Sequence, residues 1–143
     1  MAFYECGGGL TKNRLNDYAQ WTTLWTATSA QLSSQTGSGG SNEVLSQTRA
    51  TLSDNIANYD LFAFEFVDYS DYNGSIPSSS VTKYKTVQVQ ELDDPVILSC
   101  YKSGLKTRII EAGGSNSVVI NQPRFVSDDS RYVVVKKIYG LKI

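Results

Sequence analysis

The stretch "YDLFAFEFVDY", residues 59–69, has the most regular pattern in the chain. Three phenylalanines recur at every second position, at residues 62, 64 and 66, and the residues between them are alanine and glutamate. A period of two places the aromatic rings on one face of a β-strand, whereas a helix would spread them around its axis. The stretch therefore predicts a strand that buries its phenylalanine face in a core.

Other segments have the short length and the β-branched or aromatic content of strands. They are "QWTTLWT" (20–26), "LSQTRATL" (45–52), "TKYKTVQVQ" (82–90), "DPVILSCY" (94–101), "GLKTRIIEAGG" (104–114), "NSVVINQPRFV" (116–126) and "RYVVVKKIYGLKI" (131–143). Turn signals separate them, and "GGSN" at 113–116 predicts a hairpin between its neighbours. This spacing predicts an all-β fold, an antiparallel, jelly-roll-like β-sandwich of about eight strands.

The pattern also predicts details of this sandwich. Trp21 and Trp25 should share one face of their strand, with Leu24 on the other face. The continuous apolar run in 94–101 is typical of a central strand. Residues 33–43, "SSQTGSGGSNE", are expected to form a linker or loop without any core-forming residue, and no helix is expected after residue 20.

The composition narrows the possible functions. The chain has 143 residues, enough for one core, and its 13 basic and 14 acidic residues give a net charge of −1. This balance argues against nucleic-acid binding, which requires several phosphates to be neutralised. Histidine, the commonest general base, does not occur in the sequence. No apolar run approaches the roughly 20 residues of a membrane span. We therefore expect a non-enzymatic protein that needs no cofactor and does not insert into membranes.

Cysteines and paired aspartates are the remaining groups with possible chemistry. Cys6 and Cys100 are too few for a zinc site, and a disulfide between them is a less favoured alternative to a buried Cys100. The aspartate pairs are 68 with 71, 93 with 94, and 128 with 129. Each pair lies in a turn-like context, where aspartate commonly caps backbone groups. Capping is therefore preferred over a glycosidase-type carboxylate pair.

The loop "DYSDYNGS", residues 68–75, combines two aromatic rings with adaptable polar groups, as binding loops often do. Its candidate ligand contacts are Tyr69, Asp71, Tyr72 and Asn73. The alternative is that the tyrosines pack over the edge of the sandwich. A calcium site is a further alternative, although the loop lacks the glutamate and the spacing of an EF-hand.

The first 20 residues are expected to form an attachment arm, and residues 21–143 the β-sandwich domain. Three consecutive glycines are costly inside a regular element, so they are interpreted as a joint. The candidate assembly contacts are Phe3, Tyr4, Cys6, Gly7, Gly8 and Gly9. The aromatic residues ahead of the joint are suited to dock on a neighbouring subunit. The alternative is a disordered terminus.

Three segments resemble a compact domain of bacteriophage and prophage tail-associated structural proteins. They are "TTLWTATSA" (22–30), "LSDNIANYDLFAFEF" (52–66) and "VVVKKIYGLKI" (133–143), and the leader "FYECGGG" is similar to glycine-rich boxes that precede such domains. The resemblance covers residues 21–143. It implies a β-sandwich of a virion protein that is exposed at the particle surface, without catalytic residues.

The resemblance and the polar loops together predict a module of the phage tail or baseplate that contacts host-surface glycans. The alternative is a structural subunit that decorates or stabilises the capsid, for instance a head fibre. Expected partners are other virion proteins, bacterial surface polysaccharide and copies of the same chain. The resemblance implies a trimer, and the outward face of 82–90, with Tyr84, Thr86, Gln88 and Gln90, is a candidate for the self-contact.

Overall fold

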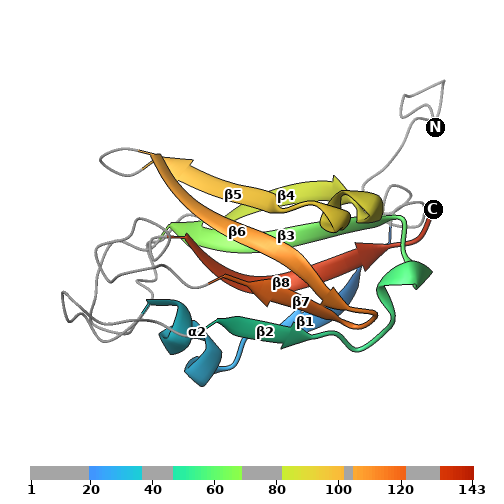
Figure 1. The fold of residues 1–143 in the computed structure, drawn as a ribbon, viewed down its shortest axis with the longest axis horizontal. Helices are drawn as coiled ribbons and strands as arrows, with labels where there is room; N and C mark the ends of the chain where they lie inside the picture. The colour runs from blue at the N-terminus through green and yellow to red at the C-terminus, as the bar shows by residue number, and fades with distance from the viewer. Residues whose placement is uncertain (1–19, 37–46, 69–81, 102–104, 122–132) are drawn as a thin grey trace, which may run out of the picture.

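The computed structural model describes residues 20–36, 47–68, 82–101, 105–121 and 133–143 (Figure 1). In this part of the chain, eight antiparallel strands form two four-stranded sheets. The first sheet has the order β1 (Thr22–Thr26), β8 (Val133–Leu141), β3 (Leu61–Asp68), β4 (Thr82–Gln88). The second has the order β2 (Thr48–Thr51), β7 (Ser117–Ile120), β6 (Leu105–Gly114), β5 (Val96–Tyr101). The predicted all-β sandwich is therefore confirmed.

The topology brings distant parts of the chain together. The first strand pairs with the last, β1 with β8, and the second described strand pairs with β7. These two outer pairs are those of a jelly roll, whereas the inner strands pair with their neighbours in sequence. The inner strands form a β3–β4 hairpin in one sheet and a β5–β6–β7 meander in the other. In Figure 1, β6 crosses in front of β3 and β8.

The core lies between the two sheets and is centred on β3. Phe62, Phe64 and Phe66 are buried there, as the period of two predicts. Burial of each ring contributes about 1.5–3 kcal/mol to the free energy of folding. The outer face of the first sheet is covered at one end, where Val67 of β3 and Val134 of β8 pack against Leu32 of the helix α2 (Ser29–Thr36). The core therefore has a small second layer outside the first sheet.

The arrangement of the first strand differs from the prediction. Leu24 and Trp25 both belong to the core cluster, while Trp21 is exposed. The β1–β8 register shifts between Thr23 and Trp25, which indicates a bulge. A bulge lets two consecutive residues face the same side, so the expected separation of the tryptophans from Leu24 is wrong.

Two predictions about this region are wrong. Residues 33–36 were expected to belong to a linker, and no helix was expected, but these residues form the end of α2 and two of them are buried. Thr28 begins α2 with a reciprocal cap: its Oγ1 accepts from Gln31 N (3.2 Å) and its N–H donates to Gln31 Oε1 (2.9 Å). Gln35 is buried near the other end of the helix. Its amide bonds both backbone groups of Val135, at 2.9 Å and 2.7 Å, so a polar side chain occupies the interior with its hydrogen bonds satisfied.

A buried arginine connects this helix to both sheets. Arg108 of β6 is only 1 % exposed. Its guanidinium donates to the carbonyl oxygens of Val133 (Nε, 3.0 Å), Asn121 (Nη1, 2.7 Å) and Gln35 (Nη2, 2.8 Å). The last carbonyl lies in the final turn of α2, where backbone oxygens lack partners within the helix. The forked geometry of arginine is suited to joining three such acceptors.

The segment after β3 differs from the prediction in two respects. β4 ends at Gln88, and residues 89–93 form the 3-10 helix η2 (Val89–Asp93) rather than the end of a strand. Glu91 Oε2 accepts from Gln88 N at 2.6 Å, which stabilises the start of η2. Among the described strands, β5 lies at the edge of its sheet and is not the central strand that its apolar run predicted. The inward-facing side chains of β5 are buried in the core, and this accounts for the apolar residues of the strand without a second neighbouring strand.

The hairpin predicted at "GGSN" is confirmed. β6 ends at Gly114 and β7 begins at Ser117, with a two-residue turn between them. Gly114 has a φ of 144°, a conformation that favours glycine. The 3-10 helix η1 (Ile56–Asn58) lies at the same end of the sandwich, because Ile56 N donates to Ser115 O at 2.8 Å.

Candidate functional site

Most residues expected from the sequence to form contacts lie outside the described ranges. This holds for the candidate ligand contacts Tyr69, Asp71, Tyr72 and Asn73 and for the arm residues Phe3, Tyr4, Cys6, Gly7, Gly8 and Gly9. Cys100 is buried in the core, as expected. The trimer therefore stays a prediction, and the Cys6–Cys100 disulfide and the calcium site stay the less favoured alternatives that the sequence leaves open.

Of the aspartate pairs, only 93 with 94 lies wholly within the described residues. Both side chains are exposed at the end of η2. Within the described part of the chain, no three Asp, Glu, Cys or His residues are grouped so that they could hold a metal ion. Asp54 illustrates the capping role: it accepts from Asn55 N, Asn58 Nδ2 and Tyr59 OH at 2.7–3.0 Å. These hydrogen bonds lower the pKa of the Asp54 carboxyl group, and the bond from the backbone N–H of Asn55 has the largest effect.

A hollow lined by aromatic rings lies on the outer face of the first sheet. We call it the aromatic face, and it consists of Trp21, Ala63, Tyr84, Thr86 and Tyr139, which enclose about 410 Å³. In the sheet register, Ala63 lies between Thr86 on β4 and Tyr139 on β8. Because the alanine side chain is much smaller than its neighbours, the surface is hollowed above it.

A buried carboxylate holds the two tyrosines in place. Glu65 lies on the same face of β3 as Ala63, directly opposite Tyr84, and is only 8 % exposed. Its Oε1 accepts hydrogen bonds from Tyr139 OH (2.8 Å) and Tyr84 OH (3.2 Å). A buried carboxylate is costly unless its oxygens are hydrogen-bonded. The two phenols therefore stabilise Glu65, and Glu65 in turn fixes the orientation of both rings.

The same environment changes the acidity of the phenols. Burial, and then the hydrogen bond to Glu65, raises the pKa of Tyr139 to about 12. Burial and the charge of Glu65 raise the pKa of Tyr84 as well. Both hydroxyl groups thus stay protonated well above neutral pH and donate to Glu65. The aromatic face therefore presents neutral phenols at neutral pH.

The residues of the aromatic face define the ligand that it could hold. Trp21 and Tyr84 are exposed, and their rings offer flat apolar surface. The hydroxyl groups of the tyrosines and of Thr86 accept hydrogen bonds as well as donate them. A ligand with an apolar ring face and several hydroxyl donors matches this combination. Sugars have both features.

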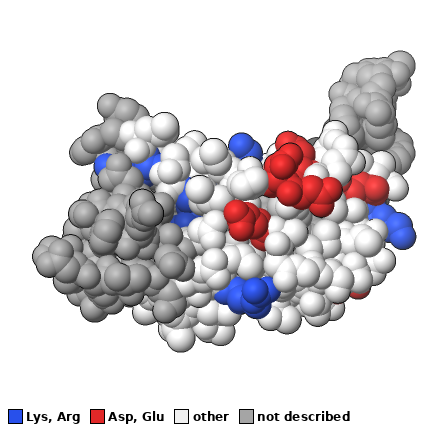
Figure 2. Space-filling model, viewed as in Figure 1, with Lys and Arg blue, Asp and Glu red and all other residues white. Residues whose placement is uncertain are grey.

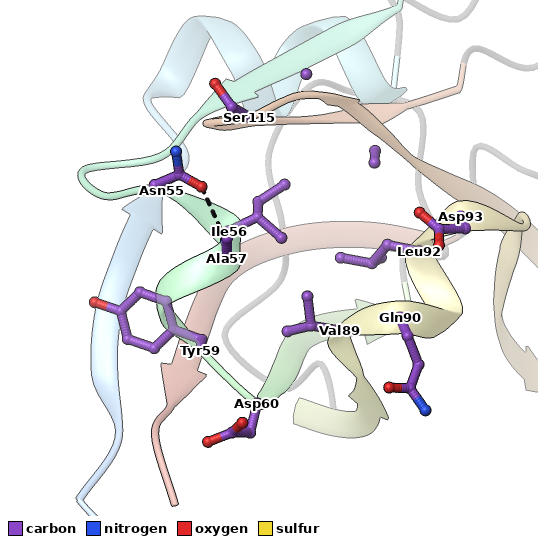
Figure 3. A pocket seen from close by; sticks show the side chains of 12 residues that line it. Asn55, Ile56, Ala57, Tyr59, Asp60, Val89, Gln90, Leu92, Asp93 and Ser115 are labelled. Carbon is purple, nitrogen blue, oxygen red and sulfur yellow. Dashed lines mark hydrogen bonds between the residues drawn. The ribbon is translucent and has the colours of Figure 1, made fainter.

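A second and larger pocket, of about 490 Å³, lies at one end of the sandwich. We call it the end pocket; it is bounded by η1, η2 and the β6–β7 turn (Figure 3). Ile56, Val89 and Leu92 point toward its centre, and the polar side chains Asp60 and Gln90 lie at its margin (Figure 3).

The side chains of the end pocket are engaged in closing the fold. Ile56, Val89 and Tyr59 pack against the core cluster. The Tyr59 ring meets Phe62 edge-on at 6.2 Å, and its hydroxyl donates to Asp54. Asn55 uses its Oδ1 to cap η1 by accepting from Ala57 N at 2.9 Å (Figure 3). We therefore take the aromatic face, and not the end pocket, as the candidate functional site.

Sequence reasoning found only part of this site. It placed Tyr84 and Thr86 on an exposed face, but it missed Trp21, Glu65 and Tyr139. One local signal was present, because Glu65 is a charged residue in the middle of an otherwise apolar run. The three aromatic rings come from β4, from β8 and from the residue before β1, so only long-range strand pairing brings them together.

Comparisons with known proteins leave the family of this chain open. No protein-family model matches the sequence, no curated protein matches it, and no solved structure matches the fold. None of the helices in the described ranges is long and apolar enough to cross a membrane.

Proposed function

We propose that this protein is a non-enzymatic module of a phage virion, located in the tail or baseplate, that binds glycans of the host surface. The aromatic face is the observation that supports glycan binding. The virion context rests on the resemblance of segments 22–30, 52–66 and 133–143 to tail-associated domains. On this proposal the protein is assembled into particles in the bacterial cytoplasm and acts at the particle surface.

The proposal uses the chemistry of the aromatic face in a simple way. A sugar ring lies over Ala63 between the rings of Trp21, Tyr84 and Tyr139, and its apolar face covers aromatic surface that is otherwise wet. Its hydroxyl groups donate to the phenol oxygens of Tyr84 and Tyr139 and to the hydroxyl of Thr86. Glu65 and the tyrosines are already hydrogen-bonded to one another, so the site loses little side-chain entropy when it binds.

Binding by purified variants tests the proposal. Host polysaccharides are titrated into the full chain, and the dissociation constant is compared with that of Trp21→Ala and Tyr84→Ala. Loss of one aromatic anchor commonly costs more than about 1.4 kcal/mol, so each variant should bind at least about tenfold more weakly. Ile143→Ala is the control, since Ile143 is an apolar side chain that is 88 % exposed and does not line the aromatic face.

The outcomes are distinct. Weakened binding by the two aromatic variants, with unchanged binding by the control, supports the proposal. Equal binding by all four proteins contradicts the site, and no binding to polysaccharide from any host strain contradicts the glycan function. Gold labelling of the protein in phage particles tests its place: label at the tail or baseplate supports the proposal, and label over the head assigns the chain to capsid decoration instead.

A further inference from the structure

The four edge strands of the sandwich differ in how they are protected against pairing with other chains. Natural edge strands are commonly protected by charges, bulges or short length. β1 has a register shift, β2 is four residues long and contains Arg49, and β4 contains Lys83 and Lys85. β5 has six residues, "VILSCY", and none of them is charged. It is the edge strand with the least protection among the described strands.

The backbone of β5 has groups directed away from β6, at an edge where no other described strand pairs. Asn121 N donates to Ile109 O at 3.0 Å, so the backbone groups of Ile109 face β7. The N–H and C=O groups of successive residues in a strand point to opposite sides. The N–H and C=O groups of Ile110 therefore face β5, where Val96 is the paired residue. On β5 the same alternation turns the N–H and C=O groups of Ile97 and Ser99 away from β6. These groups are positioned to continue the second sheet with another strand.

Apolar side chains adjoin this edge on the outer face of the second sheet. Ile97 is 51 % exposed and lies directly opposite Ile109, which is also exposed. Leu105, at the start of β6, is also exposed on this face, with Thr107 between it and Ile109. Exposed apolar side chains that adjoin on a protein surface, as Ile97 and Ile109 do, commonly mark a contact site.

Charge along this side of the molecule is acidic at one end of β5 and basic at the other. Glu91, Asp93 and Asp94 precede β5, and acidic atoms gather over η2 in Figure 2. Lys106 lies near the far end of β5 in the β5–β6 register, and Lys83 lies near the start of β4, away from η2. β4 and β5 border one groove of about 370 Å³, which Lys85 lines together with Glu91 and Asp94, so both strands belong to the same side and the acidic end keeps an excess of carboxylates.

We infer that two copies of this chain pair through β5, antiparallel and about a two-fold axis, and so join their second sheets into one sheet of eight strands. A two-fold contact uses the same surface on both copies. It brings the acidic end of each β5 to the basic end of the other, whereas parallel pairing would bring like charges together. A register with Leu98 opposite Leu98 of the partner subunit keeps both inward faces on the core side.

The pairing has a consequence for glycan binding that rests on the proposed function. The two-fold axis is perpendicular to the joined sheet, so the aromatic faces of both copies point to the same side of the dimer. Two sites on one side can bind one surface together, and their joint affinity exceeds that of either site alone. The expected trimer requires a different contact, so the oligomeric state distinguishes the two arrangements.

Sedimentation equilibrium of the full chain over a range of concentrations tests the pairing. The wild-type protein should reach twice the 15.7 kDa of one chain. Ser99→Lys places two like charges near the axis at an exposed position and should give a monomer at the same concentrations. Thr51→Lys makes the same kind of change at an exposed position on the opposite edge of the sheet, and should remain dimeric.

Amide hydrogen exchange gives a second readout that does not depend on a variant. The N–H groups of Ile97 and Ser99 should exchange slowly where the protein is dimeric and rapidly after dilution. A wild-type monomer at all concentrations, a trimer, a dimeric Ser99→Lys, or equal exchange at both concentrations overturns the inference. Binding of a single sugar site is measured separately on the monomer, so failure of the dimer leaves the proposed function standing.

Discussion

Replacing Arg108 with methionine removes the guanidinium that joins α2 to both sheets while keeping a long apolar side chain. Three backbone carbonyls lose their donor: those of Gln35, Asn121 and Val133. Backbone acceptors cannot be replaced by apolar groups, so the variant leaves them buried without this partner. We expect a large loss of stability, because Arg108 is one of the most deeply buried side chains in the described structure.

The magnitude follows from the three hydrogen bonds. A buried polar group that loses its partner costs about 1–3 kcal/mol. Asn121 is only half-buried, so water can reach its carbonyl, and we take the lower part of the range for each group. The sum is about 3–5 kcal/mol, a large share of the roughly 5–15 kcal/mol that stabilises an average domain. Arg108→Lys should fall between wild type and methionine, since one ammonium cannot match the fork of the guanidinium.

Urea denaturation followed by circular dichroism measures the effect. With a slope of about 2 kcal/mol per molar urea, the midpoint of Arg108→Met should fall by about 1.5–2.5 M. Arg49→Met is the matched control: Arg49 also donates to a backbone carbonyl, that of Gly113, but it is exposed. Its loss should cost less than about 1 kcal/mol. Equal midpoints for the two variants would refute the assignment of Arg108 as the connection between the sheets.

Two further predictions concern other buried polar groups. Gln35→Leu removes both amide bonds to Val135 (2.9 Å and 2.7 Å) and should lower stability by about 2–4 kcal/mol in the same urea assay; a change below about 1 kcal/mol would contradict the burial of this side chain. Tyr139 has its pKa raised from 10.0 to about 12 in the folded chain. Between these pH values the unfolded chain loses the phenolic proton and the folded chain keeps it, so stability should fall as the pH rises. The wild-type urea midpoint should therefore decrease more steeply from pH 10 to 12 than that of Tyr139→Phe, and parallel curves would contradict the contact with Glu65.

The sequence was most informative where the pattern is local. The period of two around Phe64 predicts β3 and its buried face, and "GGSN" predicts the β6–β7 hairpin, because both depend on neighbouring residues. The apolar run of β5 predicts burial correctly, but it cannot show whether a strand has one partner or two. That depends on β6, and on the absence of a second partner among the described strands.

Polar residues in the interior were the main source of error. "TSAQ" at 28–31 has the residues of a capping box, but α2 is short and polar, and its burial depends on Val135, about a hundred residues further along the chain. The aromatic face was likewise hidden, because its members meet only when β1, β8, β3 and β4 pair. In both cases the decisive contacts are long-range hydrogen bonds or strand registers, and the local signals at Glu65 and at residues 28–31 do not identify the partners.

The binding of glycan at the aromatic face is tested most directly by the indole N–H resonances of the two tryptophans. Trp21 lies on the aromatic face and Trp25 lies in the core, so one chain carries both a reporter and its control. During titration with polysaccharide from a susceptible host, the Trp21 resonance should shift and saturate while that of Trp25 stays in place. An unchanged Trp21 resonance, with shifts confined to residues 69–73, would contradict the account. The glycan site would then be the loop of residues 68–75.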